Sequence, residues 1–580
     1  MNARILAPLT VALLAACSTT EAPPPAGAGL ATIPEGWAYP LDPQLARADS
    51  ALVATDAPLA TDVGVQVMRG GGNAVDAAVA VAFTLAVVYP EAGNIGGGGF
   101  MVAHMADGTA ASLDFREKAP LAATRDMYLD AQGETTEASL IGHLASGVPG
   151  AVMGLWEAHR RFGTKPWAEL LEPAIRLASE GFVVDEQLAA SIAGGARRLQ
   201  RFEGSAALFL PDGVPPAEGS TWRNPDLAAV LRRIATDGPA GFYAGETADL
   251  IVAEMERGGG LITRADLAAY TAEWREPVRF RYRGHEVLSM PPASSGGITL
   301  ALIAGILEGY DLAAFGWHSP LALHVTAEAM RRAFADRNHF LGDPDFISIP
   351  SELLEPGYWE RLRETIDTAR ATPSADVTAG AALLVESVHT THFSIVDPQG
   401  NAVALTTTIN DLYGSGVTVA GAGFLLNDEM DDFAAKPGTP NMYGLVQGEM
   451  NAIEPGKRML SAMTPTIVLD PDGAPLLVTG ARGGPRIITA VFQVLSNVLD
   501  YGFDLGPAVN APRIHHQHLP DRLGFEPGGL PATTVAALNA KGHEVEERSG
   551  YVGNAPTLLR RDGVWWGLAD PRSGGAASGY

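Results

Sequence analysis

The chain has 580 residues, 47% of them hydrophobic, and a formal net charge of −26. This length and apolar content allow a large packed core and exclude a wholly disordered chain. The acidic balance argues against nucleic acid or an anionic membrane surface as the main partner, because both are bound by basic patches.

The first residues have the pattern of an export signal. A short apolar stretch ends at Leu14-Ala15-Ala16-Cys17 and is too short to span a bilayer. We expect residues 1–16 to be a lipoprotein signal peptide, Cys17 to carry the lipid, and residues 17–48 to form a Pro/Ala-rich tether. Ser18, in place of Asp, favours a periplasm-facing position on the outer membrane. An ordinary secretory signal with an incidental cysteine is the alternative.

Glycine-rich segments and helical periodicity organise the next part of the chain. A buried helix is expected after the glycines at 70–72, and strands are expected at 101–104 and 111–115. Four glycines at 96–99 lack a following Lys-Ser/Thr, so they indicate close backbone approach beneath a pocket and not a phosphate loop. Helices are expected at 167–180 and 321–340.

From Thr391 the pattern changes to strand alternation. Residues 391–396 and 402–409 flank a turn and predict a hairpin, and 464–469 with 475–478 repeat that layout. Helices are expected at 486–499 and 532–541. Two hairpins with flanking helices indicate stacked layers of sheet and helix.

The pair Thr390-Thr391 opens this strand pattern. Threonine is common in strands, so the pair alone is weak evidence of function. A threonine hydroxyl becomes a useful nucleophile only beside a base. If the chain is cut before Thr390, its own α-amine, with a pKa of roughly 7.7–8.0, is such a base.

Separated motifs in a fixed order carry a family resemblance. They lie at residues 72–78, 114–117, 390–394, 427–433, 457–465, 483–486 and 570–580. From about residue 49 to its end, the chain resembles a γ-glutamyltransferase (γ-glutamyltranspeptidase) of the N-terminal-nucleophile hydrolase superfamily. The resemblance implies an α+β fold, an αββα four-layer sandwich. This single globular unit would consist of two autoproteolytic fragments, a large subunit (49–389) and a small catalytic subunit (390–580).

The resemblance also implies a reaction. The γ-glutamyl amide of glutathione or a related donor is attacked, a γ-glutamyl-threonine ester forms, and the acyl group passes to water or to an amino-acid or dipeptide amine. The two fragments stay associated as a heterodimer, and no cofactor is needed. The implied membrane contact is through the lipid anchor alone.

Residue roles follow from the same resemblance. The chain is cut between His389 and Thr390. The implied catalytic residues are the nucleophile Thr390, its hydroxyl partner Thr408, and the oxyanion-hole residues Gly483 and Gly484. The implied substrate-binding residues are Arg116 and Ser461 for the α-carboxylate, Asn410, Glu429 and Asp432 for the α-ammonium, and Tyr443 as gate of a lid at 436–451.

One position departs from the family pattern. The family usually has two serines where this chain has Ser461-Ala462. The Ala462 N–H remains, but one hydroxyl is lost, which would weaken donor binding by roughly 1.5–3 kcal/mol if that hydroxyl bonds the carboxylate.

Two other patterns contain side chains that can bind metals. His515-His516-Gln517-His518 looks like a metal cluster, but adjacent histidines point in different directions and no nearby Cys or Glu completes a site. The acidic run at 428–432, taken alone, is typical of a solvated turn or, weakly, of a metal loop. We expect no metal at either.

Two other functions remain open. One is a cephalosporin or glutaryl acylase with the same catalytic groups, which Ala462 weakly favours and which Arg116 and the lid argue against. The other is an unprocessed lipoprotein that binds γ-glutamyl peptides, against which the presence of Thr390 and Thr408 argues.

Overall fold

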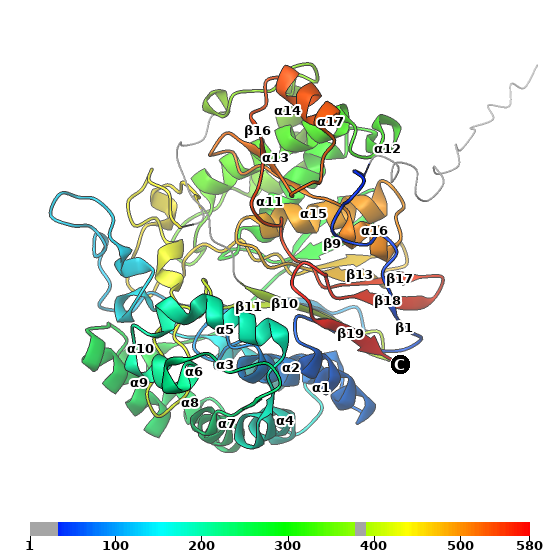
Figure 1. The fold of residues 1–580 in the computed structure, drawn as a ribbon. Helices are drawn as coiled ribbons and strands as arrows, with labels where there is room; N and C mark the ends of the chain where they lie inside the picture. Colours follow the sequence, from blue (N-terminus) through cyan, green and yellow to red (C-terminus); the bar gives the residue numbers. More distant parts are fainter. Residues whose placement is uncertain (1–32, 378–389, 443) are drawn as a thin grey trace, which may run out of the picture.

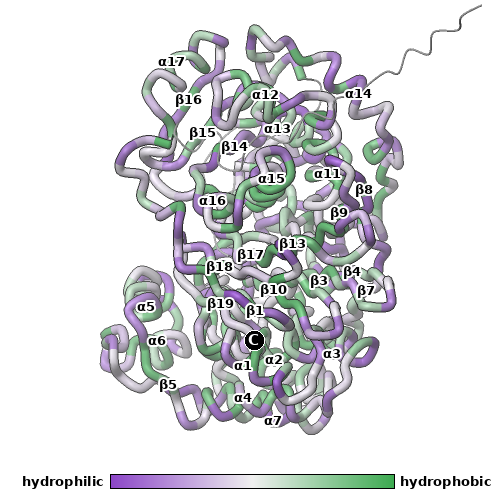
Figure 2. The backbone as a smooth tube through the Cα atoms, turned by 90° about the vertical axis from the view of Figure 1, so that its right-hand side faces the viewer, coloured by the Kyte–Doolittle hydropathy of each residue, from purple (hydrophilic) through white to green (hydrophobic). Residues whose placement is uncertain are grey.

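The computed structural model describes residues 33–377, 390–442 and 444–580. Two seven-stranded sheets lie face to face between two layers of helices, so the predicted αββα sandwich is confirmed (Figure 1). Figure 2 shows the same order from another side, from α1, α2 and α4 through the strands to α11 and α15. Within the described residues, the helices are too short or too polar to cross a bilayer.

The first sheet contains the strand that follows Thr390. All its neighbouring strands run antiparallel. In spatial order they are β19 (Ala576–Gly579), β2 (Leu52–Thr55), β10 (Thr391–Val396), β11 (Ala402–Thr408), β3 (Gly98–His104), β4 (Ala110–Phe115) and β7 (Glu273–Arg275).

The second sheet is also antiparallel throughout. Its order is β1 (Ala46–Ala48), β18 (Val564–Leu568), β17 (Thr557–Arg561), β13 (Pro475–Thr479), β12 (Thr466–Leu469), β9 (His285–Ser289) and β8 (Val278–Tyr282). Smaller sheets pair β5 (Phe182–Val183) with β6 (Thr221–Trp222), and join β14 (Ile514–His515), β15 (Leu523–Phe525) and β16 (Val545–Glu547).

Strand alternation divides the core into two parts. On β3, Met101 and Ala103 pack in the cluster that contains α1 and α2, whereas Phe100 and Val102 pack in the cluster that contains the second sheet. Because successive side chains point to opposite faces, a fully buried strand contributes side chains to both parts of the core. All residues of β3, β10 and β11 are buried for this reason.

Helices cover the outer face of each sheet. The first layer includes α1 (Pro58–Arg69), α2 (Ala74–Val88), α3 (Ala151–Phe162), α4 (Trp167–Glu180), α5 (Glu186–Leu199), α6 (Glu203–Phe209), α7 (Pro225–Asp237), α8 (Ala240–Tyr243), α9 (Gly245–Gly258) and α10 (Arg264–Ala269). The second includes α11 (Gly296–Leu307), α12 (Leu312–Phe315), α13 (Pro320–Phe340), α14 (Pro356–Glu364), α15 (Arg486–Leu499), α16 (Leu505–Asn510) and α17 (Ala532–Ala540).

The predicted elements agree closely with these bounds. Helices 167–180 and 486–499 match α4 and α15 at both ends. The strand predicted at 464–469 begins at Thr466, because Pro465 has no N–H to donate to a ladder. The strand predicted at 402–409 ends at Thr408, and two residues later Asn410 has a positive φ of 74°.

The glycine run at 96–99 lies where the sequence predicted close backbone approach. A Cβ at Gly97 would lie 2.1 Å from the Thr408 carbonyl oxygen, and one at Gly99 would lie 2.4 Å from that of Thr406. Only glycine therefore lets this backbone pack so close to β11, the strand that carries Thr408.

Candidate active site

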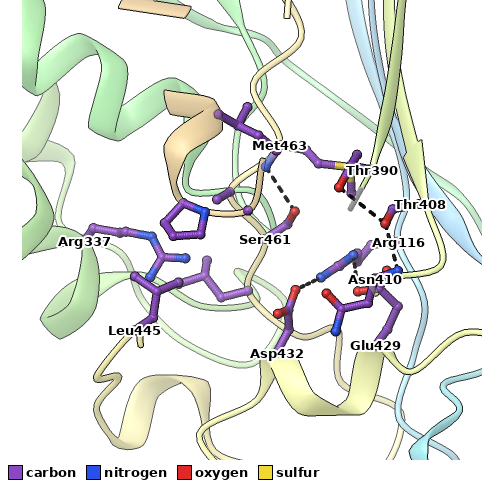
Figure 3. Close-up of a pocket in the computed structure, with 15 residues that line it drawn as sticks. Arg116, Arg337, Thr390, Thr408, Asn410, Glu429, Asp432, Leu445, Ser461 and Met463 are labelled. Carbon is purple, nitrogen blue, oxygen red and sulfur yellow. Dashed lines mark hydrogen bonds and ion pairs between the residues drawn. The ribbon is translucent and has the colours of Figure 1, made fainter. Parts of the chain in front are cut away.

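Thr390 lies immediately before β10, and its side chain is buried. The antiparallel register pairs His392 with Thr406, which brings Thr390 opposite Thr408 at the ends of the two strands. The Thr390 hydroxyl donates to the Thr408 hydroxyl oxygen across 3.5 Å, and that oxygen also accepts the Asn410 N–H at 2.8 Å (Figure 3). The two predicted hydroxyls are thus neighbours.

Arg116 lies one residue beyond β4 and is fully buried among carboxylates. Its Nη1 lies 2.6 Å from Glu429 Oε2 and 3.5 Å from Glu117 Oε2, and its Nη2 donates to Asp432. Glu429 and Asp432 belong to one short 3-10 helix. The acidic run is therefore not a solvated turn, since it is buried and two of its carboxylates contact one guanidinium.

The charges in this cluster do not balance. Three carboxylates surround one guanidinium, so an added cation would be favoured. Burial raises the pKa of Glu117 to about 7 and that of Glu429 well above its usual value, although Arg116 opposes both shifts. Burial also raises the pKa of Asp432, again against Arg116. An ammonium group of a ligand would restore balance.

Asn410 and Ser461 complete the polar lining. Asn410 Nδ2 donates to the Asp428 carbonyl at 3.0 Å. Ser461 Oγ accepts the Met463 N–H at 3.1 Å, so its own hydroxyl proton is free to point elsewhere. Both residues line one pocket together with Thr390, Thr408 and Ala462.

Gly483 and Gly484 directly precede α15 and have φ values of 138° and 54°, which glycine adopts readily. Their carbonyls accept the Arg486 and Ile487 N–H groups, which fixes the turn to the helix. Gly484 lines the pocket, whereas Gly483 is not among its lining residues. The predicted oxyanion hole therefore has one of its two residues at the pocket wall.

Three predicted positions lie outside the described residues: Cys17, His389 and the gate residue Tyr443. The lipid attachment, the carboxyl side of the scissile bond and the gate thus remain predictions. The neighbouring lid residue Leu445 is described and lines the pocket.

The pocket also contains a residue to which the sequence assigned no role. Arg337 lies near the end of α13 and is fully buried. It follows Met330 and Phe334 at the spacing of one helix face, both of which are buried. An arginine on the apolar face of a helix is a sequence signal that could have indicated a functional residue.

The histidines at 515–518 contact separate partners. His515 bonds Thr489 and Gln517, His516 faces Asp521, and His518 bonds the Ser374 carbonyl. Elsewhere His324, Glu328 and His543 lie close enough to share an ion. Glu328, however, is already paired with Arg331 and Arg332, so we interpret its surroundings as a buried ion-pair network.

Comparisons with known proteins agree with this geometry. The family model for gamma-glutamyltranspeptidase matches residues 60–580. The chain is 45% identical over 564 residues to the glutathione hydrolase proenzyme of Escherichia coli (strain K12), covering 97% of this chain and 96% of that protein.

Two solved structures have a fold similar to that of this chain. The cephalosporin acylase from Bacillus halodurans has a TM-score of 0.83 at 29% identity, with 94% of this chain and 99% of that chain covered. The Helicobacter pylori gamma-glutamyltranspeptidase has a TM-score of 0.55 at 44% identity, with 56% of this chain and 93% of that chain covered.

Proposed function

The chain belongs to the gamma-glutamyltranspeptidase family, and from that premise we propose that it is a self-processing γ-glutamyltransferase and glutathione hydrolase. It cleaves the γ-glutamyl amide of glutathione and related donors, and it passes the acyl group to water or to an amino-acid or dipeptide amine. The observation that carries this proposal is the Thr390–Thr408 hydroxyl pair in one pocket with Arg116 and its carboxylates.

Maturation is the first reaction. The Thr390 hydroxyl attacks the His389 carbonyl, the peptide C–N bond breaks, and an ester joins the two residues. Water then hydrolyses the ester, which leaves a carboxylate on His389 and a free α-amine on Thr390. Before this cut the nitrogen is an amide and cannot act as a base.

The mature site then performs acyl transfer. The Thr390 α-amine takes the hydroxyl proton while Oγ attacks the donor γ-carbonyl, and backbone N–H groups at Gly483 and Gly484 stabilise the oxyanion. The leaving amine takes the proton, and the ester remains on Thr390. Water or an acceptor amine attacks this ester and restores the enzyme.

A denaturing gel followed by N-terminal sequencing tests maturation. We expect two fragments, the smaller beginning at Thr390, and one uncut, inactive chain for Thr390→Ala. Normal fragments from that variant would place the cleavage chemistry elsewhere. A single band in fresh and aged wild-type samples would instead favour a γ-glutamyl-peptide-binding lipoprotein.

A donor comparison tests the substrate. Release of p-nitroaniline from the γ-glutamyl anilide should be faster than from the glutaryl anilide, which lacks the α-amine that Glu429 and Asp432 would bind. Equal rates would favour the second candidate, a cephalosporin or glutaryl acylase. The fold match to the Bacillus halodurans acylase and Ala462 are the observations that support this candidate.

We also propose that the protein faces the periplasm from the outer membrane, anchored by a lipid on Cys17. The support is the motif Leu14-Ala15-Ala16-Cys17 with Ser18 after it. Cys17→Ala should move the protein from the detergent phase to the aqueous phase in a phase-partition experiment. An unchanged distribution would contradict the anchor.

A further inference from the structure

Asp56 is a buried carboxylate directly beside the strand that follows the proposed nucleophile. It comes immediately after β2, which lies between β10 and β19 in the first sheet, and it is 1% exposed. Asp56 Oδ2 accepts the hydroxyl of Thr391 at 2.9 Å, and Oδ1 accepts that of Ser573 at 3.3 Å. Thr391 is the residue after Thr390, so Asp56 fixes the chain next to the attacking oxygen.

A series of hydrogen bonds continues from Ser573 to the proposed oxyanion hole. The Ser573 N–H donates to the Asp570 carbonyl oxygen at 3.3 Å, and Asn554 Nδ2 donates to the same oxygen at 2.9 Å. Asn554 and Arg482 exchange two backbone hydrogen bonds, at 2.9 and 3.0 Å. Arg482 directly precedes Gly483. The series that begins at the buried carboxylate therefore ends at the turn that holds the oxyanion donors.

The side chain of Arg482 is also fixed beside this turn. Its Nη1 donates to the Tyr89 hydroxyl, its Nη2 donates to the Tyr551 hydroxyl at 2.9 Å, and Glu91 Oε1 lies 3.8 Å from Nη1. Burial raises the pKa of Asp56, and the positive charge of Arg482 opposes this shift, which means that the two groups attract each other. The nucleophile strand and the oxyanion turn are thus connected both by hydrogen bonds and by charge.

Acyl transfer depends on the geometry between these two parts of the site. The attacking oxygen and the oxyanion donors act on the same carbonyl group, so a displacement of about 1 Å between them can cost about a hundredfold in rate. Asp56 and Thr391 are not among the residues that line the pocket, so they act on the reaction only through their neighbours.

We propose that Asp56 is a positioning residue, whose carboxylate holds the nucleophile strand in alignment with the oxyanion turn through Thr391 and Ser573. This inference rests on the proposed function. Asp56 belongs to the large subunit and both of its hydrogen-bond donors belong to the small one. The large subunit therefore positions the nucleophile of the small subunit after the chain is cut.

Thr391→Val and Thr391→Ser form a matched pair, because valine has the shape of threonine without its hydroxyl and serine keeps the hydroxyl. For matured Thr391→Val we expect kcat on the γ-glutamyl anilide to fall roughly ten- to hundredfold, the range for one charge-assisted hydrogen bond. KM and the inhibition constant of L-glutamate, which report donor binding, should stay as in the wild type. Thr391→Ser should keep most of the wild-type kcat.

Asp56→Asn tests whether the two residues act through the same contact. Combined with Thr391→Val, it should lower kcat by less than the product of the two single effects, because one hydrogen bond can be lost only once. Fully multiplicative effects would contradict the connection.

A purely structural role gives a different pattern. A lower melting temperature with unchanged kcat in Thr391→Val would overturn the proposal, and so would an equal loss of kcat in both Thr391 variants. Should Thr391→Val not mature, Ser573→Ala removes the other hydrogen bond to the carboxylate at a partly exposed position. It should lower kcat with KM unchanged, and an unchanged kcat would overturn the proposal.

Failure of the proposed function is seen in the wild type. If the wild type cleaves the glutaryl anilide and not the γ-glutamyl anilide, that function is wrong. The same variants are then compared on the glutaryl anilide, because its cleavage needs the same nucleophile and oxyanion turn. A mature wild type that cleaves neither anilide would overturn both proposals.

Discussion

At the scale of residues, the groups predicted to bind opposite ends of the donor bind each other. Arg116 was assigned to the carboxylate, and Glu429 and Asp432 to the ammonium, yet the structure pairs them directly. Charged groups that are buried together pair because an isolated buried charge is costly. Donor binding therefore has to exchange ion pairs within this cluster.

Glu117 supplies a prediction on stability. Neither of its carboxylate oxygens has a hydrogen-bond partner within the described residues, and burial raises its pKa from 4.5 to about 7. Between these values the folded protein binds more protons than the unfolded chain, so stability falls as pH rises from about 4.5 to 7 and then levels. Glu117→Gln should therefore match the wild type near pH 4 and exceed it above pH 7, by roughly 3 kcal/mol at most.

Unfolding measured from pH 4 to 8 checks this expectation. Glu360→Gln is a suitable control, since the Glu360 side chain is 63% exposed. A difference between Glu117→Gln and wild type that stays constant across this range would mean that Glu117 does not titrate in the folded protein.

Residues of the site could be predicted from the sequence where the chemistry requires a particular residue type. Thr390, Thr408, Asn410 and Ser461 all line the predicted pocket. Arg337 was missed because an arginine within a helix is usually a solvated residue, and its spacing from the buried Met330 and Phe334 was the one sequence signal to the contrary. Contacts between distant helices and loops leave no local sequence signal.

At the scale of elements, the hairpin of β10 and β11 was predictable because both strands and their turn are contiguous in the sequence. The insertion of β2 beside β10 was not, since Ala54 pairs with Ser394, which lies far from it in the sequence. Likewise, alternation marked β10 as a strand but did not show that both its faces are covered. Burial on two faces depends on the second sheet and on α2, which pack from elsewhere in the chain.

The contact between the sheets beneath Thr390 can be tested at Gly480, which follows β13. A Cβ there would lie 2.4 Å from the ring of His392, and that ring is fixed by hydrogen bonds to Thr406 and Ser394. Gly480→Ala should therefore destabilise the fold by about 1–3 kcal/mol through overpacking. It should also slow self-cleavage, because His392 lies two residues from Thr390 on the same face.

Thermal denaturation and the rate at which the two fragments appear report these effects. Gly550→Ala is the matched control, since a Cβ at Gly550 would meet no atom within 4 Å. If both alanine variants behave like the wild type, the lack of a side chain at Gly480 is not what allows the two sheets to pack this closely.

At the scale of the whole molecule, the two proposed fragments are interleaved. The first sheet takes β2, β3, β4 and β7 from the large subunit and β10, β11 and β19 from the small one. In the second sheet, β12, β13, β17 and β18 of the small subunit lie between β1 and β9 of the large one. Cutting before Thr390 therefore divides the chain without dividing the core.

This interleaving predicts that the cut fragments do not separate under native conditions. The mature protein should elute as one species in size-exclusion chromatography, both at low salt and in 1 M salt. At 1 M salt the attraction between exposed charges is screened beyond a distance of about 3 Å. Salt does not weaken strand ladders or buried apolar contacts. In urea, release of the small fragment should coincide with loss of the folded circular-dichroism signal, and residues 390–580 expressed alone should not fold. Release by salt without unfolding would mean that surface charges, and not the shared sheets, hold the fragments together.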